Sequence, residues 1–264
     1  MEGRPVTSVR AACSLAALIL VFACSVSSTP ESRGVWAVRG VHFRASCLSD
    51  EVADCKPVDV PSPDHENVAS VYYRKLLFED GDYAFESFVH VERKQGPPTD
   101  FIPHGHVENE LLWSPDSKTL LNTGSDGNTG LEFVEVYRLS DSELRPTRIT
   151  DTAQRDMLQV LPPCKAKNVA PRDCEFLLQH PETVNMVALD WTADSKGIVV
   201  MAEIPCYPRY GGIMCAILGY ELDAASGTIL RRMQPQELAE RWKASIAWDF
   251  KVPDPPEFQQ SGQE

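Results

Sequence analysis

Three residues within one five-residue stretch have side chains that could bind a metal ion. His104, His106 and Glu108 alternate in the sequence His-Gly-His-Val-Glu, and alternate residues of a β-strand project from one face. Two imidazoles and a carboxylate could hold zinc and leave a position open for a water molecule, as in a hydrolytic site. Pro103 and Gly105 indicate a turn instead, in which case the histidines are solvated. A metal-dependent hydrolase is therefore the alternative hypothesis, and our main expectation is no metal and no cofactor.

Other reactive patterns are weaker. The loop Asp126-Gly127-Asn128 offers oxygen ligands for calcium but lacks the full EF-hand spacing, and a simple turn needs no ion. The sequence contains no G-x-S-x-G, no H-E-x-x-H and no glycine-rich phosphate loop. His65-Glu66 begins such a zinc motif, but the second histidine is missing. We therefore expect the protein not to be an enzyme.

Charge and composition narrow the classes of partner. The 264 residues include 25 Lys and Arg against 38 Asp and Glu, which gives a formal net charge of −13. Such an acidic chain lacks the basic stripes that bind a phosphate backbone, so no nucleic-acid partner is expected. The 43% of apolar residues is typical of a globular domain and excludes a disordered or fibrous chain.

The N-terminus has the pattern of a secretory signal. Arg4 and Arg10 precede residues 11–23, which are apolar apart from Ser14. This run is too short for a membrane-spanning helix, which takes about 20 apolar residues. We predict a signal peptide over residues 1–23 and a serine-rich tether over residues 24–34.

The end of this segment, Leu20-Val21-Phe22-Ala23-Cys24, resembles the lipobox of bacterial lipoproteins. The resemblance implies that Cys24 becomes the lipid-modified first residue of the mature chain. Phe22 departs from the pattern, since a smaller residue is usual there, and ordinary cleavage within Ser25–Thr29 remains the alternative. In some bacterial lipoproteins an Asp directly after the lipidated cysteine resembles an inner-membrane retention signal, and this chain has Ser25 at that position. The analogy implies an anchor on the periplasmic face of the outer membrane.

The remaining cysteines fall into three close pairs. Cys13 leaves with the signal peptide and Cys24 would carry the lipid, so an even number remains, as in many exported proteins. No C-x-x-C pair indicates metal binding. Closing each short loop would stabilise the fold by about 2.5 kcal/mol. Of the 15 connectivities that six cysteines allow, the spacing favours three local disulfides: Cys47–Cys55, Cys164–Cys174 and Cys206–Cys215.

The chain between residues 35 and 250 reads as strands and turns. Residues 68–78 and 83–93 predict a hairpin around the turn 79–82, and residues 107–139 predict a three-stranded meander. Further strands are expected at 35–43, 198–201 and 217–222, with a proline-rich loop over 56–66. One helix is predicted, from Pro235 to Lys243 or Ala244, with a final strand over 246–250 and a disordered tail over 251–264.

One phrase occurs twice. Leu-Trp-Ser-Pro-Asp-Ser-Lys at 112–118 returns as Asp-Trp-Thr-Ala-Asp-Ser-Lys at 190–196, which is 78 residues later (from 112 to 190). A weaker turn at Asp80-Gly81-Asp82 lies 36 residues before Asp116 (from 80 to 116). These spacings approach one and two units of about 40 residues, the size of a propeller blade. Trp113 and Trp191 share one repeat position. We expect them to pack in the core, with an exposed binding strip as the alternative.

This phrase resembles the repeat of TolB-type and related WD40-like β-propellers, which has a tryptophan, a turn like Ser-Pro-Asp-Ser-Lys and then an apolar strand. In that family the turn joins two inner strands of a blade. Ser117 and Ser195 stand where glycine is usual, and Ala193 replaces proline. The resemblance implies an all-β fold of antiparallel meanders. Because the mature chain is short for six blades with long loops, we expect a small or incomplete β-propeller-like array over residues 35–250.

These observations lead to one functional hypothesis. We expect an exported, lipid-anchored protein of the cell envelope that acts as a non-enzymatic protein-interaction module. Propellers mostly bind their partners through loops, and by analogy with that fold we expect loops to form the binding site here. The loops 94–108 and 203–215 are the expected contact regions for an envelope protein partner. A plain structural protein of the envelope is a third possibility.

Overall fold

The computed structural model describes residues 37, 39–47, 55–105, 107–125, 132–140, 143–242 and 256–257. They belong to one compact unit, Ser32–Glu264. The predicted signal peptide, Cys24 and the tether lie outside the described residues, as do His106, the loop 126–128 and the expected strand 246–250. No helix in the described ranges is long and apolar enough to cross a membrane.

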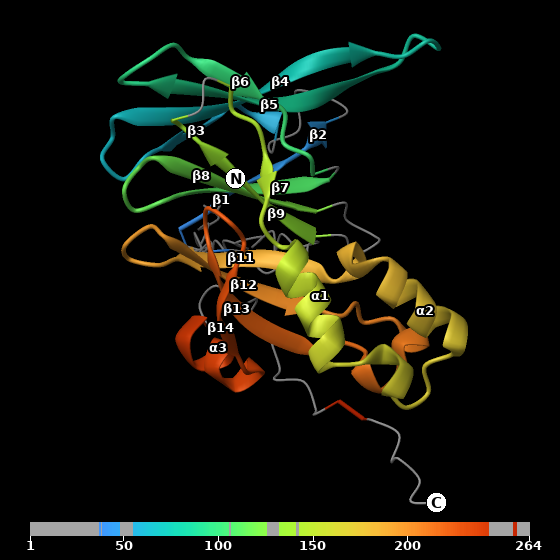
Figure 1. Ribbon diagram of the computed structural model, residues 1–264. Coiled ribbons are helices and arrows are strands. Elements are labelled where there is room, and N and C mark those ends of the chain that lie inside the picture. The colour runs from blue at the N-terminus through green and yellow to red at the C-terminus, as the bar shows by residue number, and fades with distance from the viewer. Residues whose placement is uncertain are drawn as a thin grey trace, which may run out of the picture. The chain divides into compact units, whose positions relative to one another are not determined.

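The strands of the described residues form three antiparallel sheets (Figure 1). The first sheet has the order β2-β5-β4-β3, with β6 also paired to β5, and the second has the order β1-β7-β8-β9-β10. The third has the order β11-β12-β13-β14. The bounds in chain order are β1 Val41–Arg44, β2 Ser46–Cys47, β3 Val58–Pro61, β4 Asn67–Leu77, β5 Tyr83–Arg93, β6 Thr99–Phe101, β7 Glu108–Trp113, β8 Thr119–Ser125, β9 Glu132–Arg138, β10 Thr147–Arg148, β11 Asn185–Trp191, β12 Gly197–Glu203, β13 Ile217–Asp223 and β14 Ile229–Met233.

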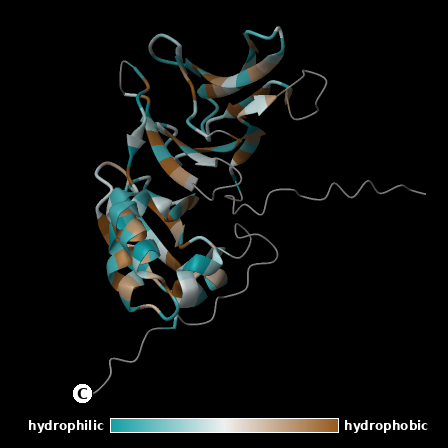
Figure 2. Cartoon of the chain, turned by 90° about the vertical axis from the view of Figure 1, so that its right-hand side faces the viewer, coloured by the Kyte–Doolittle hydropathy of each residue, from teal (hydrophilic) through white to brown (hydrophobic). Residues whose placement is uncertain are grey.

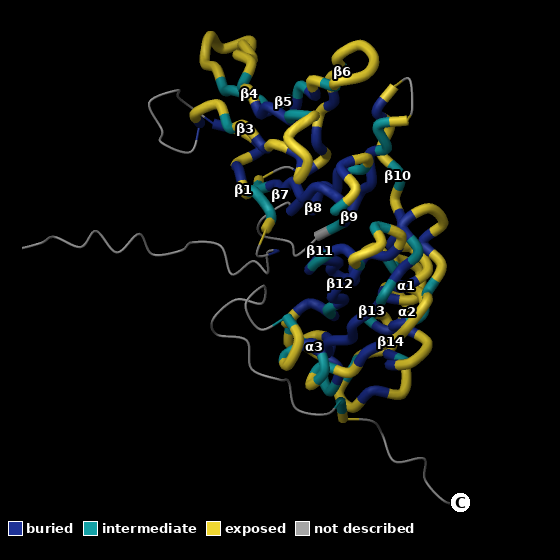
Figure 3. The backbone as a smooth tube through the Cα atoms, turned by 90° about the vertical axis from the view of Figure 1, so that its left-hand side faces the viewer, coloured by how far each residue is buried: buried dark blue, intermediate teal, exposed yellow. Residues whose placement is uncertain are grey.

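The second sheet is buried on both faces because its strands carry apolar residues at odd and even positions. Leu111 and Trp113 pack with Val71 and other residues of the first sheet. Leu112 and Leu121 pack on the opposite face, in the core shared with the third sheet. Figure 2 shows hydrophobic residues along these strands, and Figure 3 shows their backbone as buried. The sheets therefore share two cores, one on each side of the second sheet.

Helices complete the third sheet. α1 (Asp151–Val160) and α2 (Pro171–Gln179) add Met157 and Leu177 to the core between the second and third sheets. Our prediction of a single helix was therefore wrong. The i, i+4 spacing of Ala153 and Met157 places both on one helical face, so the sequence does indicate α1. Short 3-10 helices lie at η2 Pro163–Lys165, η3 Pro181–Thr183 and η4 Pro208–Ile213. The predicted C-terminal helix is confirmed as α3 (Pro235–Trp242).

The predicted fold class is confirmed. The predicted hairpin is β4–β5 and the predicted meander is β7–β8–β9, each with continuous antiparallel register. The described residues form three successive four-stranded meanders, β3–β6, β7–β10 and β11–β14, which is an incomplete β-propeller-like array. One boundary was wrong, since residues 58–61 of the predicted loop 56–66 form β3.

The repeat begins earlier than we predicted. The turn equivalent to Ser114–Lys118 is Ser62–Glu66, between β3 and β4, and not the turn at Asp80. In each copy the first hydroxyl donates to the Asp two residues later, at 2.6 Å from Ser62, 2.7 Å from Ser114 and 2.7 Å from Thr192. The tripeptide Ser-Pro-Asp occurs at 62–64 and again at 114–116, so the sequence held the signal.

The fourth residue of every turn has a left-handed backbone. His65 has φ 59°, and Ser117 and Ser195 each have φ 62°. A side chain in this region costs free energy that glycine avoids, which explains why glycine is usual at this position in the family that the repeat resembles. The two serines use their side chains: Ser117 Oγ accepts the amide hydrogen of Asp64 at 3.1 Å, and Ser195 Oγ accepts that of Asp116 at 3.0 Å.

The repeat tryptophans form a second connection between neighbouring sheets. Trp113 Nε1 donates to the Val60 carbonyl at 2.8 Å, and Trp191 Nε1 donates to the Leu112 carbonyl at 3.4 Å. Both indoles are 4% exposed. The core interpretation of the tryptophans is confirmed, and each one also fixes its sheet to the backbone of the preceding sheet.

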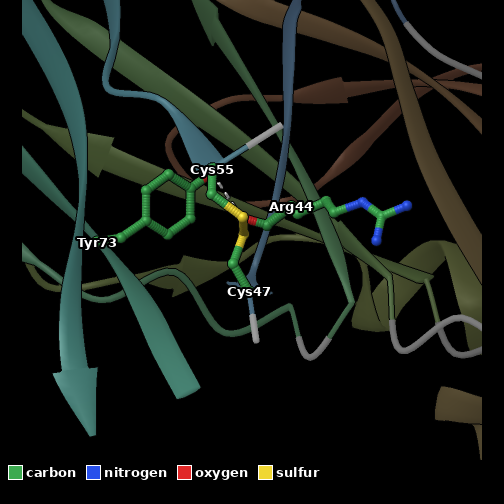
Figure 4. Close-up of a disulfide and its surroundings, with 4 residues drawn as sticks. All are labelled: Arg44, Cys47, Cys55 and Tyr73. Atoms are coloured by element: carbon green, nitrogen blue, oxygen red, sulfur yellow. Dashed lines mark hydrogen bonds between the residues drawn. A yellow bond between two sulfur atoms is a disulfide. The ribbon is translucent and has the colours of Figure 1, made fainter. Parts of the chain in front are cut away.

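All three predicted disulfides are present. They join Cys47 to Cys55, Cys164 to Cys174 and Cys206 to Cys215, with Cα–Cα distances of 6.0, 5.1 and 4.4 Å. The first lies beside Tyr73 of β4, whose hydroxyl donates to the Arg44 carbonyl at 3.2 Å (Figure 4). Each disulfide therefore closes a short local loop.

Candidate functional site

The predicted metal ligands do not come together in the described residues. His104 Nδ1 lies 2.8 Å from Glu135 Oε1, and Glu135 also accepts the Tyr137 hydroxyl at 3.0 Å. Glu108 instead lies 3.5 Å from His42 Nε2 of β1. Glu135 faces the first sheet, whereas the strand register places Glu108 on the opposite face of the second sheet. The expected convergence of His104 and Glu108 is therefore wrong, because Gly105 and Val107 precede β7 as a loop.

The His104–Glu135 pair was not predicted, since its members are 31 residues apart in sequence. A buried carboxylate that holds one imidazole nitrogen is the usual partner of a metal-binding or proton-transferring histidine. The His104 ring is 56% exposed. In the described residues, the one group of three candidate ligands close enough for a metal is Glu203, Cys206 and Cys215, and both cysteines are in a disulfide.

A serine, a histidine and an aspartate lie in one row on the outer face of the first sheet. Ser70 of β4 pairs with His90 of β5, which pairs with Asp100 of β6. His90 Nδ1 is 2.6 Å from Asp100 Oδ1, as in a nucleophilic triad. The Ser70 hydroxyl, however, donates to Asp59 at 2.6 Å, away from the imidazole. The row is a set of cross-strand polar pairs rather than an activated serine.

Glu110 is a buried acid on the side of the second sheet that faces the third sheet. Its side chain lies against Ala37 and Gly40, and a Cβ at position 40 would overlap its carboxyl group. Neither carboxyl oxygen has a hydrogen-bond partner of good geometry among the described residues. Burial raises the pKa of Glu110 to about 8. The carboxyl group is therefore mainly protonated at pH 7.

The two expected contact loops differ. In the loop 94–108, Ile102 and Val107 are exposed. In the loop 203–215, Tyr210 and Ile213 are fully buried. Glu257, which we placed in a disordered tail, donates its amide hydrogen to the Gly212 carbonyl at 2.8 Å. The second loop therefore contributes part of its apolar residues to the core, whereas Met214 stays exposed.

A group of large apolar side chains is exposed at the end of the β4–β5 hairpin, on both faces of its strands. We call it the hairpin patch, and it comprises Tyr72, Leu76, Leu77, Phe78 and Tyr83. These are five of the twelve large apolar side chains that the described residues expose, and Leu77 is 73% exposed. Tyr72 stacks on Phe88 across the strands with ring centroids 5.6 Å apart. Figure 3 shows this end of the hairpin as exposed.

Cationic side chains lie within the hairpin patch. Arg74 Nε donates to Glu86 at 2.7 Å, on the next strand. Lys75 Nζ lies 3.9 Å from the centre of the Tyr83 ring. The patch therefore combines apolar area with aromatic rings and an arginine, and both aromatic residues and arginine are enriched in protein interfaces. Sequence analysis predicted the hairpin but not its exposure.

Comparisons with known proteins add little about function. No protein-family model matches the chain, and no curated protein shows significant sequence similarity. Among solved structures, the chain is similar to the β-propeller domain of the Trilobed protease from Pyrococcus furiosus, with a TM-score of 0.35 and 15% identity. The similarity covers 71% of this chain and 42% of that chain, so the protein spans less than half of its neighbour's length. A similarity of this size carries no inference about activity.

Proposed function

We propose that the protein is an exported, lipid-anchored and non-enzymatic interaction module, and that an envelope protein binds its hairpin patch. The observation that carries this proposal is the clustering of exposed apolar side chains on one projecting hairpin. Apolar groups gathered on a monomer surface mark interaction sites more often than scattered ones do. The three disulfides are consistent with an oxidising compartment.

The hydrolase alternative has less support. Its proposed ligands His104 and Glu108 contact different partners on opposite faces of the second sheet. The test is zinc analysis of the purified protein and of the His106→Ala variant. We expect no stoichiometric zinc in either protein, and zinc that disappears in the variant would restore the hydrolase hypothesis.

Photocrosslinking tests the binding surface. A photoreactive residue replaces Leu77 in the tagged, full-length protein within its native envelope. The matched control is Leu230 of β14, a leucine that is 55% exposed on another sheet. We expect one reproducible partner from position 77 and none from position 230. Equal capture from both positions, or none from position 77, would contradict the proposed surface.

The anchor is tested separately. Cys24→Ser removes the cysteine that resembles a lipidation site, whereas Cys13→Ser changes a cysteine within the predicted signal peptide. We expect the first variant to lose the added lipid mass and to leave the membrane fraction, and the second to behave as the wild type. An unmodified mature N-terminus beyond Cys24 in the wild-type protein would refute the lipid anchor.

A further inference from the structure

The loop 203–215 contains three side chains that the proposed function does not use. Glu203 Oε1 lies 3.2 Å from Cys206 Sγ. The ligand atoms of Glu203, Cys206 and Cys215 all lie within 4.8 Å of one another, and the described residues contain no other such group of three. The two sulfur atoms are joined as a disulfide, so the group can hold a metal ion only after this disulfide has been reduced.

The Cys206–Cys215 disulfide is the one in which neither cysteine is buried. Cys206 is exposed and Cys215 is half-buried. Cys47 and Cys55 of the first disulfide are both buried, and so is Cys174 of the second. Exposed disulfides are the more easily reduced ones, because reduction begins when a thiolate reaches and attacks one of the sulfur atoms. A reductant should therefore open the disulfide of the loop 203–215 first.

The backbone keeps the two cysteines close together without the help of their disulfide. They lie in the connection from β12 to β13, in which the last cross-strand pair is Glu203 with Ile217. Beyond this pair, the Ile204 amide donates to the Ala216 carbonyl at 2.9 Å. The Cα atoms of the two cysteines are 4.4 Å apart. Reduction would therefore leave two thiols beside a carboxyl group on a backbone that is held in place by the sheet.

We propose that Glu203, Cys206 and Cys215 bind a zinc ion when the disulfide is reduced. Thiolates and carboxylates are both zinc ligands, and zinc bonds of about 2.0–2.3 Å place tetrahedral ligand atoms about 3.5–4 Å apart. The net charge of −13 favours a cation over an anion as the ligand. The inference does not depend on the proposed function, because it concerns another loop and needs no protein partner.

A buried amide lies next to the proposed site. Asn185 is opposite Glu203 in the strand register, and its side chain hydrogen-bonds to the Glu203 carboxyl group. Asn185 is 7% exposed, and its Oδ1 has no hydrogen-bond partner among the described residues. Three protein ligands leave the fourth tetrahedral position of zinc to a water molecule. A free buried acceptor beside the ligands is suited to accept a hydrogen bond from that water.

Formation of the site requires a dithiol as the reductant. One thiolate of the dithiol attacks Cys206 Sγ and displaces the Cys215 thiolate, which leaves a mixed disulfide. The second thiolate of the dithiol then displaces Cys206 and closes the disulfide of the reductant. Two electrons have passed from the dithiol to the protein. Zinc binds both cysteines as thiolates, and their protons go to the solvent.

Limited reduction of the purified full-length protein tests the site. The protein is treated with increasing amounts of dithiothreitol, then with zinc chloride, and is desalted. Alkylation followed by mass spectrometry should show that Cys206 and Cys215 are reduced before the other disulfides. Elemental analysis should find about one zinc per chain in the reduced protein and none in the oxidised protein. Reduction of this pair only after the buried Cys47–Cys55 disulfide would overturn the proposal.

Two double cysteine variants show which thiols bind the metal. Cys206→Ser/Cys215→Ser should bind no zinc after reduction, whereas Cys164→Ser/Cys174→Ser should bind it as the wild type does. Tryptophan fluorescence of each reduced sample reports whether the fold is kept. Absence of zinc from the reduced and folded wild-type protein would overturn the proposal, and so would equal zinc in the first variant. Unfolding when this pair alone is reduced would also overturn it, because the ligands would then separate.

The carboxylate ligand has its own matched pair of variants. Glu203→Gln keeps the size of the side chain but removes the charge, so the reduced protein should bind zinc at least about tenfold more weakly. Glu221→Gln changes another half-buried glutamate of the third sheet and should leave zinc binding unchanged. Titration with zinc in competition with a chelator measures both affinities. Equal affinity of the Glu203→Gln variant and the wild type would refute the proposed ligand set.

Discussion

The first and third sheets differ in what covers their outer faces. On the third sheet, α3 places Leu238 on an apolar cluster that includes Leu189, Val199 and Met201. The outer face of the first sheet has no comparable cover among the described residues, and it carries Tyr72 and the row from Asp59 to Asp100. A short array of repeats needs its ends protected from solvent. One end is protected by the chain's own helix, and the other leaves an aromatic surface exposed.

The connections between sheets show the same asymmetry. The second and third sheets each contact the preceding sheet through two hydrogen-bonding side chains. One is a tryptophan, and the other is a serine whose backbone has a left-handed conformation. In the first sheet the equivalent residues are Pro61 and His65. Proline has no indole hydrogen to donate, so the first sheet lacks the group with which the others bind a preceding repeat. Among the described residues, the first sheet is therefore the one without this connection to a further repeat.

The largest predicted effect is a pH dependence of stability that comes from one of the two cores beside the second sheet. Folding raises the pKa of Glu110 to about 8, so the folded protein binds this proton more tightly than the unfolded chain. The stabilisation is complete below the ordinary pKa and is lost as the pH rises through about 8. Between pH 5 and about pH 8 the unfolded chain has lost this proton and the folded protein keeps it, so each of these three pH units lowers the unfolding free energy by about 1.36 kcal/mol. We therefore expect about 4 kcal/mol less stability at pH 9 than at pH 5.

Denaturant titrations monitored by tryptophan fluorescence measure this effect. Glu110→Gln is the control, because a neutral amide should remove the pH dependence. Since Glu110 lies on the side of the third sheet, the core around Trp191 should loosen before the core around Trp113. An unchanged slope with pH in the Gln variant would show that another group is responsible.

Truncating one leucine at each end tests the comparison directly. Leu238 is fully buried under α3, whereas Leu77 is 73% exposed. Leu238→Ala should cost about 3 kcal/mol of unfolding free energy, as a buried leucine usually does. Leu77→Ala should cost less than about 0.5 kcal/mol. A large loss from Leu77→Ala would mean that the hairpin patch is covered in the isolated protein, and the contrast between the two ends would fail.

Removing a disulfide at each end should give similar losses. Cys47–Cys55 and Cys206–Cys215 close loops of comparable length, so each double Cys→Ala variant should lose about 2.5 kcal/mol. Thermal unfolding of the two variants measures the losses. A much larger loss for the first pair would show that Tyr73 and the Arg44 carbonyl depend on that disulfide for their positions.

The sequence predicted local features well and distant contacts poorly. The close cysteine pairs, the β4–β5 hairpin and the Ser114 turn are encoded within about a dozen residues, and each was found. The Glu135 partner of His104 and the burial of Glu110 depend on strands that meet only in the fold. The first repeat was predicted at Asp80-Gly81-Asp82, whereas Ser62-Pro63-Asp64 has the same tripeptide as residues 114–116. Helix α1 also has a local signal, the i, i+4 pair of Ala153 and Met157.

The smallest effect tests the missing connection in the first sheet. His65 and Ser117 have the same left-handed backbone, which costs a non-glycine residue about 1 kcal/mol. His65→Gly should therefore stabilise the protein by about 0.5 to 1 kcal/mol, because no hydrogen bond from the exposed imidazole to another sheet is present in the part of the chain that the structure describes. Ser117→Gly should be near neutral, because relief of the backbone is offset by loss of the hydrogen bond from the Asp64 amide. Chemical denaturation compares the two variants. If both variants are stabilised equally, the hydrogen bond from the Asp64 amide to Ser117 Oγ adds no stability. The first sheet would then differ from the second and third sheets only in lacking the tryptophan hydrogen bond.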